Sequence, residues 1–261
     1  MGLVREKEIK EVTALTLKAG DILAKEFRAG RINNIRFKSK HEITTAADFI
    51  AERIILKKLK DLTPDWRIIS EETGDNHKKS AWLWLVDPLD GTTNFYMGSP
   101  LFAVQIALVY KQEPILAYIY APVIAEFYFA EKNKGAYLNS KKIHASKRKI
   151  NQALLTYCHG NNEKDLKKAL KLYQHFKLHN FDIRQIGSAA LEFGWLAKGR
   201  TDCYISPGAR PWDVIPGSLL VKESGGKVYD FKGKPWEINS TTVFASNGII
   251  DKTILRFLKT L

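Results

Sequence analysis

The stretch Trp82–Phe95, "WLWLVDPLDGTTNF", joins the most apolar run of the chain to acids and small hydroxyl residues. Five apolar residues lead directly into Asp87, which predicts a strand buried on both faces. Pro88 cannot donate a ladder hydrogen bond, so we expect the strand to end there. Asp90 and Gly91 follow, and the next letters, "TTN", indicate the start of a short helix. Two carboxylates at the end of a buried strand are either turn and cap residues or partners of a cation.

Acids occupy three other places of the same kind, each beside an apolar run. Glu71 and Glu72 close a strand, and Asp48 and Asp213 lie in the first turns of predicted helices. Taken singly, the glutamates can be a surface pair, and the aspartates can be acids that interact favourably with a helix dipole. Taken together, four carboxylate sites beside apolar runs favour a hard divalent cation. Mg²⁺ prefers oxygen ligands and is commonly used with phosphate substrates.

The residues after the acids suit phosphate chemistry. Backbone N–H groups at the start of a helix form an anion site, and a threonine hydroxyl can help to position a water molecule. The pattern therefore predicts metal-assisted, in-line hydrolysis of a phosphate ester without a covalent enzyme intermediate. No "GxxxxGK[ST]" sequence is present, so nucleotide hydrolysis of the P-loop type is not indicated. The six histidines lack the spacing of a zinc site.

Charge, hydrophobicity and cysteine content indicate the kinds of partner and the cellular compartment that suit the chain. The 261-residue chain carries a net charge of +13, which attracts phosphate, RNA or anionic lipid at long range. Lysines are densest in residues 140–149 and 164–171, and in the second stretch a solvated helix face competes with a nucleic-acid site as the explanation. No apolar run approaches the length of about 20 residues that a membrane span needs. Cys158 and Cys203 lack metal spacing, which indicates a reducing cytoplasm.

The pattern of elements changes along the chain. Amphipathic helices are predicted at 7–27 and 44–60, a short hairpin at 32–44, and strands at 66–72 and 81–87. Residues 102–157 are strand-rich and predict an antiparallel meander. After residue 161 we expect helices that alternate with short strands, as in an α/β layer, with helices near 162–178, 188–198, 212–224 and 250–260, and strands near 181–186, 202–206, 227–231 and 242–246.

Five blocks of the sequence, taken together, resemble the inositol monophosphatase family, which is part of a lithium-sensitive, magnesium-dependent phosphatase superfamily. They stand in the family's order, and the resemblance spans residues about 38 to 226. The blocks are "DPLDGTTNF" (87–95), "WDVIPGSLLVKESGG" (212–226), "SEET" (70–73), "TTAAD" (44–48) and "IGSAAL" (186–191).

The resemblance implies a mixed α+β / α/β fold, a layered α-β-α-β-α sandwich. Residues 1–150 would supply the N-terminal helices and an antiparallel sheet with most of the metal ligands. Residues 151–261 would form an α/β half that completes the site, and both parts would make one compact unit. A homodimer is implied as well.

The resemblance also implies two to three Mg²⁺ ions per active site. The first ion would be held by Glu71, Asp87 and the Leu89 carbonyl, the second by Asp87, Asp90 and Asp213, and a weaker third would lie near Glu71. Thr92, paired with Asp48, would orient and help to deprotonate the attacking water, which makes Thr92, Asp48 and Glu71 the implied catalytic residues. Lys38 corresponds to a lysine that the family often has near the metals, and Glu72 is a further candidate.

Substrate contacts follow from the same blocks. Phosphate would be bound by the N–H groups of Gly91 and Thr92, and the sugar-alcohol pocket would be lined by Asp90, Gly187, Ser188, Ala189 and Asp213. One position departs from the pattern. Ser206 stands where many relatives have a glutamate that contacts inositol hydroxyls, and the nearby Arg210 is a candidate contact for another anionic substrate, or else a surface arginine.

The resulting expectation is a Mg²⁺-dependent phosphatase that hydrolyses myo-inositol-1-phosphate to inositol and phosphate, in the cytoplasm and without membrane attachment. An alternative is a fructose-1,6-bisphosphatase or a broader sugar phosphatase, acting on another phosphorylated polyol or sugar. A second alternative is a regulatory protein of the same family, associated with transcription. The +13 charge would suit weak contact with RNA or RNA polymerase.

Overall fold

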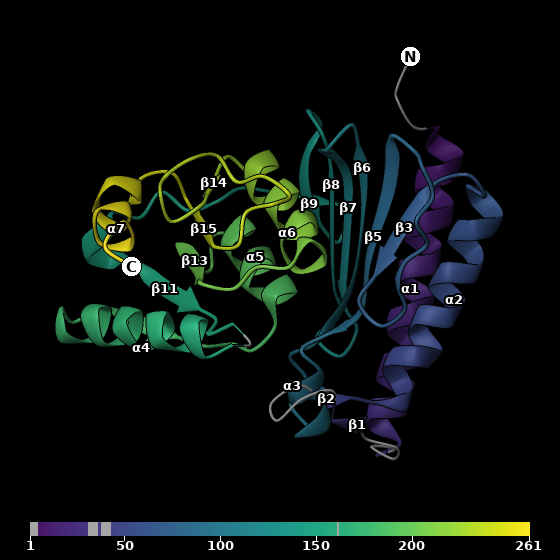
Figure 1. Cartoon of the computed structure of the whole chain (residues 1–261), viewed down its shortest axis with the longest axis horizontal. Coiled ribbons are helices and arrows are strands. Elements are labelled where there is room, and N and C mark those ends of the chain that lie inside the picture. Colours follow the sequence, from purple (N-terminus) through teal and green to yellow (C-terminus); the bar gives the residue numbers. More distant parts are fainter. Residues whose placement is uncertain (1–4, 31–35, 38–42, 161) are drawn as a thin grey trace.

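The protein consists of five stacked layers, seen in a computed structural model that describes residues 5–30, 36–37, 43–160 and 162–261. The described residues form a helix pair, an eight-stranded sheet, a second helix pair, a five-stranded sheet and an outer helix pair (Figure 1). Buried apolar clusters fill the spaces between the layers. This order confirms the layered α-β-α-β-α sandwich.

The first helix pair covers one face of the eight-stranded sheet. It consists of α1 (Glu6–Arg28) and α2 (Ala46–Leu62), both close to their predicted bounds. Gly20 lets α1 approach the sheet, because a Cβ atom at this position would lie 2.3 Å from the ring of Tyr120. Neither α1 nor any other helix of the described residues is both long and apolar enough to cross a membrane.

The eight-stranded sheet has the order β10-β9-β8-β7-β6-β5-β3-β4. Its pairs are antiparallel except for β3 and β5, which are parallel neighbours. β5 is buried along nearly its whole length, as its apolar run predicts. The strands are β3 (Arg67–Ser70), β4 (Gly74–Asp75), β5 (Trp82–Asp90), β6 (Ala103–Tyr110), β7 (Glu113–Ala121), β8 (Glu126–Glu131), β9 (Gly135–Leu138) and β10 (Lys141–Ile143).

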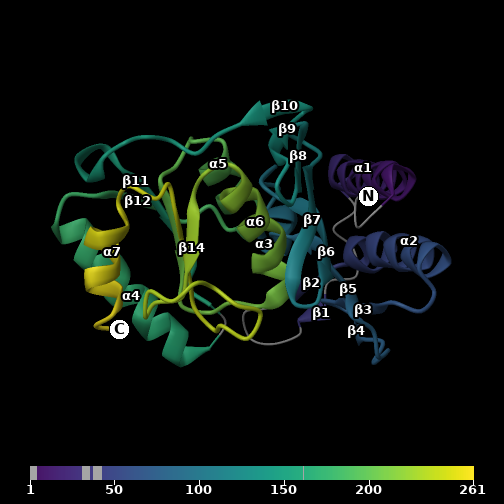
Figure 2. The same cartoon turned by 90° about the horizontal axis from the view of Figure 1, so that it is seen from above.

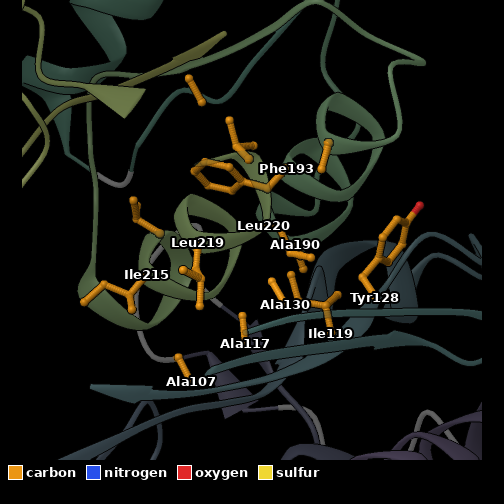
Figure 3. Packing of buried hydrophobic residues seen from close by; sticks show 14 of the residues in the cluster. Ala107, Ala117, Ile119, Tyr128, Ala130, Ala190, Phe193, Ile215, Leu219 and Leu220 are labelled. Carbon is orange, nitrogen blue, oxygen red and sulfur yellow. The ribbon is translucent and has the colours of Figure 1, made fainter. Parts of the chain in front are cut away.

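The second helix pair lies between the two sheets. α5 (Ala189–Ala197) and α6 (Pro211–Glu223) pack their apolar residues against the free face of the eight-stranded sheet (Figure 3). Gly217 of α6 allows the helices to touch, because a Cβ atom there would lie 2.1 Å from the ring of Phe193. Both helices are buried over most of their length, from Ala190 in α5 and from Val214 in α6.

The five-stranded sheet and its outer helices complete the fold (Figure 2). The sheet has the order β12-β11-β13-β15-β14, in which β11 runs parallel to β12 and β13 while β15 is antiparallel to its neighbours. α4 (Glu163–Leu178) and α7 (Asp251–Leu258) cover its outer face. The strands are β11 (Leu154–Tyr157), β12 (Asp182–Arg184), β13 (Cys203–Ser206), β14 (Lys227–Tyr229) and β15 (Val243–Ser246).

Two sequence-based expectations are wrong. β5 does not end at Pro88 but continues to Asp90, because the register with β6 shifts between Asp87 and Asp90 and no ladder donor is required in this irregular stretch. The antiparallel meander does not extend to residue 157. It ends with β10, and β11 joins the second sheet.

Two short elements lie near the end of β5. The strands β1 (Arg36–Phe37) and β2 (Ile43–Thr44) pair in an antiparallel manner, as expected of the predicted hairpin. The other hairpin residues from 32 to 42 lie outside the described residues. The short helix α3 (Thr92–Tyr96) follows β5 directly and contacts β2.

Candidate active site

The acid-bearing ends of β3 and β5 lie side by side. Ser70 at the end of β3 pairs with Val86 in the parallel register, so the chain leaves both strands at the same edge of the sheet. The Glu71 N–H donates to the Val86 carbonyl at 3.1 Å. At this lower end of the sheet in Figure 1, β5 runs into α3, and β2 leads into α2. Glu71, Asp87 and the first turn of α2 therefore belong to one region.

Asp87 is one of the most deeply buried acids of this region, with 1% of its surface exposed. Its Oδ1 accepts the Leu89 N–H at 3.0 Å, and its Oδ2 accepts the Gln105 Nε2 at 3.3 Å. Burial raises the pKa of Asp87 well above its ordinary value, and three nearby carboxylates raise it further. Those carboxylates belong to Glu71, Asp90 and Asp213. We call these four residues the acid ring.

Asp90 connects β5 to the start of α5. Its carboxylate accepts hydrogen bonds from the Ser188 hydroxyl, the Ala189 N–H at 3.1 Å and the Ala190 N–H at 2.9 Å. A carboxylate at a helix N-terminus is favourable, because the first N–H groups have no partner within the helix. Burial still raises the pKa of Asp90 to about 6, although these three hydrogen bonds lower it. Ser188 and Ala189, both predicted site residues, thus contact Asp90 directly.

Gly91 turns the chain from β5 into α3. Its φ of 87° is in the left-handed region, and a Cβ atom would lie 3.0 Å from the Leu101 carbonyl and 3.3 Å from the Gly187 carbonyl. The turn directs the Thr92 hydroxyl back toward the strand, where it donates to the Leu89 carbonyl at 2.9 Å. Glycine at this position therefore sets the place of the hydroxyl beside the acid ring.

Asp48 holds the other side of the Thr92 hydroxyl. Its Oδ2 accepts the Thr45 N–H at 2.8 Å and the Thr45 hydroxyl at 2.6 Å, which caps the N-terminus of α2. Its Oδ1 lies 3.4 Å from the Thr92 Oγ1. Burial raises the pKa of Asp48 to about 7, against the Thr45 hydrogen bonds, and the charges of Glu72 and Glu71 raise it as well. Asp48 can therefore exchange a proton near neutral pH.

Asp213 and Arg210 come from the start of α6. Asp213 lies in the first turn, and its backbone N–H donates to the Arg210 carbonyl at 3.1 Å. The Arg210 guanidinium is 3.8 Å from the Glu71 Oε1 and lies over the Trp212 ring. Its positive charge partly offsets the repulsion within the acid ring. Arg210 is therefore at the site rather than on a distant surface.

Comparison with known proteins agrees with this arrangement. The model of the inositol monophosphatase family matches residues 5–260. The chain belongs to the inositol monophosphatase family. It is 39% identical over 219 residues to the "Nus factor SuhB" of Xylella fastidiosa, with 82% of this chain and 78% of that one covered.

A sequence and a solved structure from Thermotoga maritima are also similar to the chain. It is 33% identical over 228 residues to the "Fructose-1,6-bisphosphatase/inositol-1-monophosphatase" of this organism, with 87% of each chain covered. The solved structure of its IMPase superimposes with a TM-score of 0.89 at 30% identity over 97% of both chains. The resemblance inferred from the sequence blocks is thus confirmed, and the chain belongs among phosphatases of this family.

The acid ring has the donor chemistry of a hard-cation site, in a family that is generally metal-dependent. Its side chains offer only carboxylate oxygens, and the Leu89 carbonyl accepts the hydrogen bond of the Thr92 hydroxyl. Among the described residues, no three His, Cys, Asp or Glu side chains are already drawn together as a finished metal site. The charge of a bound cation would offset the mutual repulsion of the carboxylates. The residues therefore fit Mg²⁺ by donor type, and their assignment as ligands is a proposal.

The other predicted residues lie in different settings. Glu72 is half-buried and close enough to Asp48 to raise its pKa. Gly187 is exposed at the turn before α5. Ser206 is buried at the end of β13, where its hydroxyl donates to the Gly208 carbonyl at 2.6 Å. Lys38 lies outside the described residues.

Three buried polar residues at the site were not identified from the sequence. Gln105 contacts Asp87, and Asn94 Nδ2 donates to the Leu101 carbonyl at 2.7 Å and to the Ile186 carbonyl at 2.9 Å. Glu52 bonds to the turn that carries Glu71. Gln105 and Glu52 had a signal, because each is a lone polar residue at a position where the local periodicity predicts a buried apolar one.

Proposed function

We propose that this chain is a Mg²⁺-dependent phosphomonoesterase that hydrolyses myo-inositol-1-phosphate to inositol and phosphate. The observation that carries the proposal is the acid ring around a buried Asp87, beside the Thr92 hydroxyl and Asp48. A cluster of buried like charges costs stability, so its presence at one edge of a sheet indicates a function. The family and the relative named for inositol-1-monophosphatase activity support the choice of substrate.

Magnesium would be held by oxygen ligands from two strands and one helix. We assign two to three ions, the first to Glu71, Asp87 and the Leu89 carbonyl, and the second to Asp87, Asp90 and Asp213. When bound, magnesium neutralises phosphate and leaving-group charge and lowers the pKa of water. The glutamates and aspartates contribute their negative charge and, through the hydrogen bonds described above, a fixed position.

The remaining residues would orient the reactants. The Thr92 hydroxyl is held between the Leu89 carbonyl and Asp48, so it can pass a proton from water toward the Asp48 carboxylate. We assign phosphate binding to the N–H groups of Gly91 and Thr92. The Gly187–Ala189 turn would contact the sugar alcohol, since Asp90 fixes that turn beside the ring.

A phosphate-release assay tests the proposal. We expect wild-type protein to release inorganic phosphate from inositol-1-phosphate with Mg²⁺, to lose this activity in EDTA, and to be inhibited by Li⁺. Asp213→Asn should fall to background, whereas the exposed control Asp182→Asn, whose partner is Arg184, should match wild type. Background release from every phosphate monoester tested with Mg²⁺ present would refute the proposed activity.

Fructose-1,6-bisphosphatase or broader sugar phosphatase activity is the second candidate. The position of Arg210 favours it, because a guanidinium 3.8 Å from Glu71 can meet a second phosphate group. One Thermotoga maritima relative carries both activities in its name. The same assay decides between the two, since a higher kcat/KM on fructose-1,6-bisphosphate than on inositol-1-phosphate would make the bisphosphate the preferred substrate.

Contact with RNA or RNA polymerase is a proposed additional role. The relative named "Nus factor SuhB" and the net charge of +13 support it. Exposed lysines on α4 provide the basic surface, at Lys164, Lys167 and Lys171. We expect retention on immobilised RNA at low salt, weakened by salt and by the triple change of these lysines to glutamate, with phosphatase activity intact. Absence of retention at low salt would exclude the RNA contact.

A homodimer in the cytoplasm completes the proposal. Leu166 and Leu170 on α4 are 45% and 61% exposed, which provides apolar surface that a second copy could cover. Both cysteines are free, which suits a reducing compartment. A monomer mass in sedimentation equilibrium at micromolar concentration would exclude the dimer.

A further inference from the structure

A buried carboxylate outside the acid ring holds the turn that carries Glu71. Glu52 lies on α2 and is 2% exposed. Its Oε1 accepts three hydrogen bonds, from the Ser70 hydroxyl, the Thr73 N–H at 3.0 Å and the Thr73 hydroxyl at 3.1 Å. Ser70 and Thr73 are the residues on either side of Glu71 and Glu72. Glu52 therefore fixes both ends of this four-residue turn.

The turn is also fixed from the sheet. The Glu71 N–H donates to the Val86 carbonyl, one residue before Asp87. Glu71 thus has two restraints, one from β5 through its own backbone and one from α2 through its neighbours. A charged acceptor strengthens each hydrogen bond that it receives, so Glu52 restrains the turn more than a neutral group would. The arrangement places a further buried carboxylate near an already acidic region, which is unfavourable by itself.

α2 connects this turn to the catalytic pair. Asp48 and Glu52 are four residues apart, hence on the same buried side of the helix. Asp48 contacts the Thr92 hydroxyl, whereas Glu52 contacts the turn at Ser70–Thr73. One rigid helix therefore sets the distance between Thr92, which follows β5, and Glu71, which follows β3.

We propose that Glu52 is a positioning residue that places Glu71 for cation binding. The inference rests on the proposed metal-dependent function and goes beyond it, because Glu52 is not among the residues assigned to the cations or the substrate. Residues that orient metal ligands in this way typically change metal affinity by about 10–100-fold when they are replaced. A purely structural role would instead lower stability and leave metal affinity unchanged.

The test compares two replacements of Glu52. Glu52→Leu removes the acceptor oxygens, whereas Glu52→Gln keeps one carbonyl oxygen for Ser70 and Thr73 and loses the charge. We expect Glu52→Leu to weaken Mn²⁺ binding, measured by electron paramagnetic resonance without substrate, by about 10-fold or more. The Mg²⁺ concentration for half-maximal activity should rise in proportion, and Glu52→Gln should recover most of the loss.

Thr73→Val provides a milder variant in case Glu52→Leu fails to fold. It removes one of the three donors, so a smaller shift in Mn²⁺ affinity in the same direction is expected. Thr63→Val is the matched control at the other end of α2. It removes hydrogen bonds to the Leu59 carbonyl and from the Trp84 Nε1, so it should lower stability without changing Mn²⁺ affinity.

The outcomes separate this inference from the proposed function. Unchanged Mn²⁺ affinity in Glu52→Leu and Thr73→Val, together with lowered thermal stability, would overturn the positioning role. Wild-type protein that binds no Mn²⁺ would overturn the positioning role and the metal assignment together. Wild-type protein that binds Mn²⁺ but releases no phosphate would refute only the proposed activity. The Mn²⁺ affinities of the Glu52 variants would still decide whether Glu52 positions Glu71.

Discussion

Replacing Asp87 with asparagine is expected to abolish Mg²⁺-dependent phosphate release and to stabilise the cation-free protein. The carboxylate is assigned to both main ions, so its loss should lower kcat/KM by about 10³-fold or more, which corresponds to about 4 kcal/mol. The same change removes a buried charge that faces three other carboxylates. In EDTA at neutral pH the free energy of unfolding should rise by about 1–2 kcal/mol, as is typical when a strained site is relieved.

The hydrogen bonds around Asp87 can adapt to this change. The introduced asparagine would keep one acceptor oxygen for the Leu89 N–H, and its amide would replace the oxygen that now accepts the Gln105 Nε2. Gln105 Oε1 has no hydrogen-bond partner among the described residues, so rotation of the Gln105 amide lets Oε1 accept from the new amide group. The variant should therefore fold with no more unpaired polar groups than the wild type, since the rotated Nε2 takes the place that Oε1 now occupies without a partner.

Asp75→Asn is the matched control, and its expected change in the free energy of unfolding has the opposite sign to that of Asp87→Asn. Its carboxylate is bonded to Arg67, which holds the pKa of Asp75 below its ordinary value. Because the pKa of Asp75 is lowered in the folded state, its carboxylate stabilises the fold at pH values above the unfolded pKa. The pKa of Asp87 is raised in the folded state, so its carboxylate makes the fold less stable as pH increases. At pH 7 Asp75→Asn should thus be less stable and fully active. Urea unfolding in EDTA that shows Asp87→Asn to be the less stable variant, or near-normal turnover by it, would contradict the prediction.

Most helices and strands could be predicted from hydrophobic periodicity and from the residue types that favour the ends of helices and strands. The helices after residue 161 were predicted within one to two residues, because caps and apolar spacing are local properties. The assignment of strands to sheets was less successful. β11 has the same β-branched and apolar pattern as the strands before it, and its pairing with β12 and β13 depends on residues far along the chain. A strand pattern carries no information about its distant partner.

The acids of the site could be predicted because each marks the end of an apolar run. The residues that hold them could not. Gln105 is a polar residue within the apolar strand β6, and Glu52 lies on the buried stripe of α2, but neither pattern says which residue the side chain contacts. Their importance appears only when the register pairs Asp87 with Gln105 and when α2 packs over the turn after β3. Long-range packing decides these roles.

Replacing Thr92 with valine is expected to slow the chemical step without preventing cation binding. Valine keeps the shape of threonine but removes the hydroxyl held between the Leu89 carbonyl and Asp48. Loss of a positioned proton-transfer group typically costs about 10²–10⁴-fold in rate. We therefore expect kcat to fall by a factor in this range, with the Mg²⁺ concentration for half-maximal activity nearly unchanged.

Two neighbouring substitutions make the Thr92 result specific to the hydroxyl. Thr92→Ser keeps a hydroxyl on the same Cβ atom and should retain most of kcat, whereas Thr93→Val changes the exposed neighbouring threonine and should match wild type. Steady-state kinetics at saturating Mg²⁺, with Mn²⁺ binding measured on the same samples, separates proton transfer from ligand loss. Equal losses in Thr92→Val and Thr92→Ser, or a Thr92→Val enzyme with unimpaired kcat, would remove the hydroxyl from the mechanism. In that case Asp48 would have to act on water directly, since it is the acid nearest to Thr92 that is not assigned to a cation.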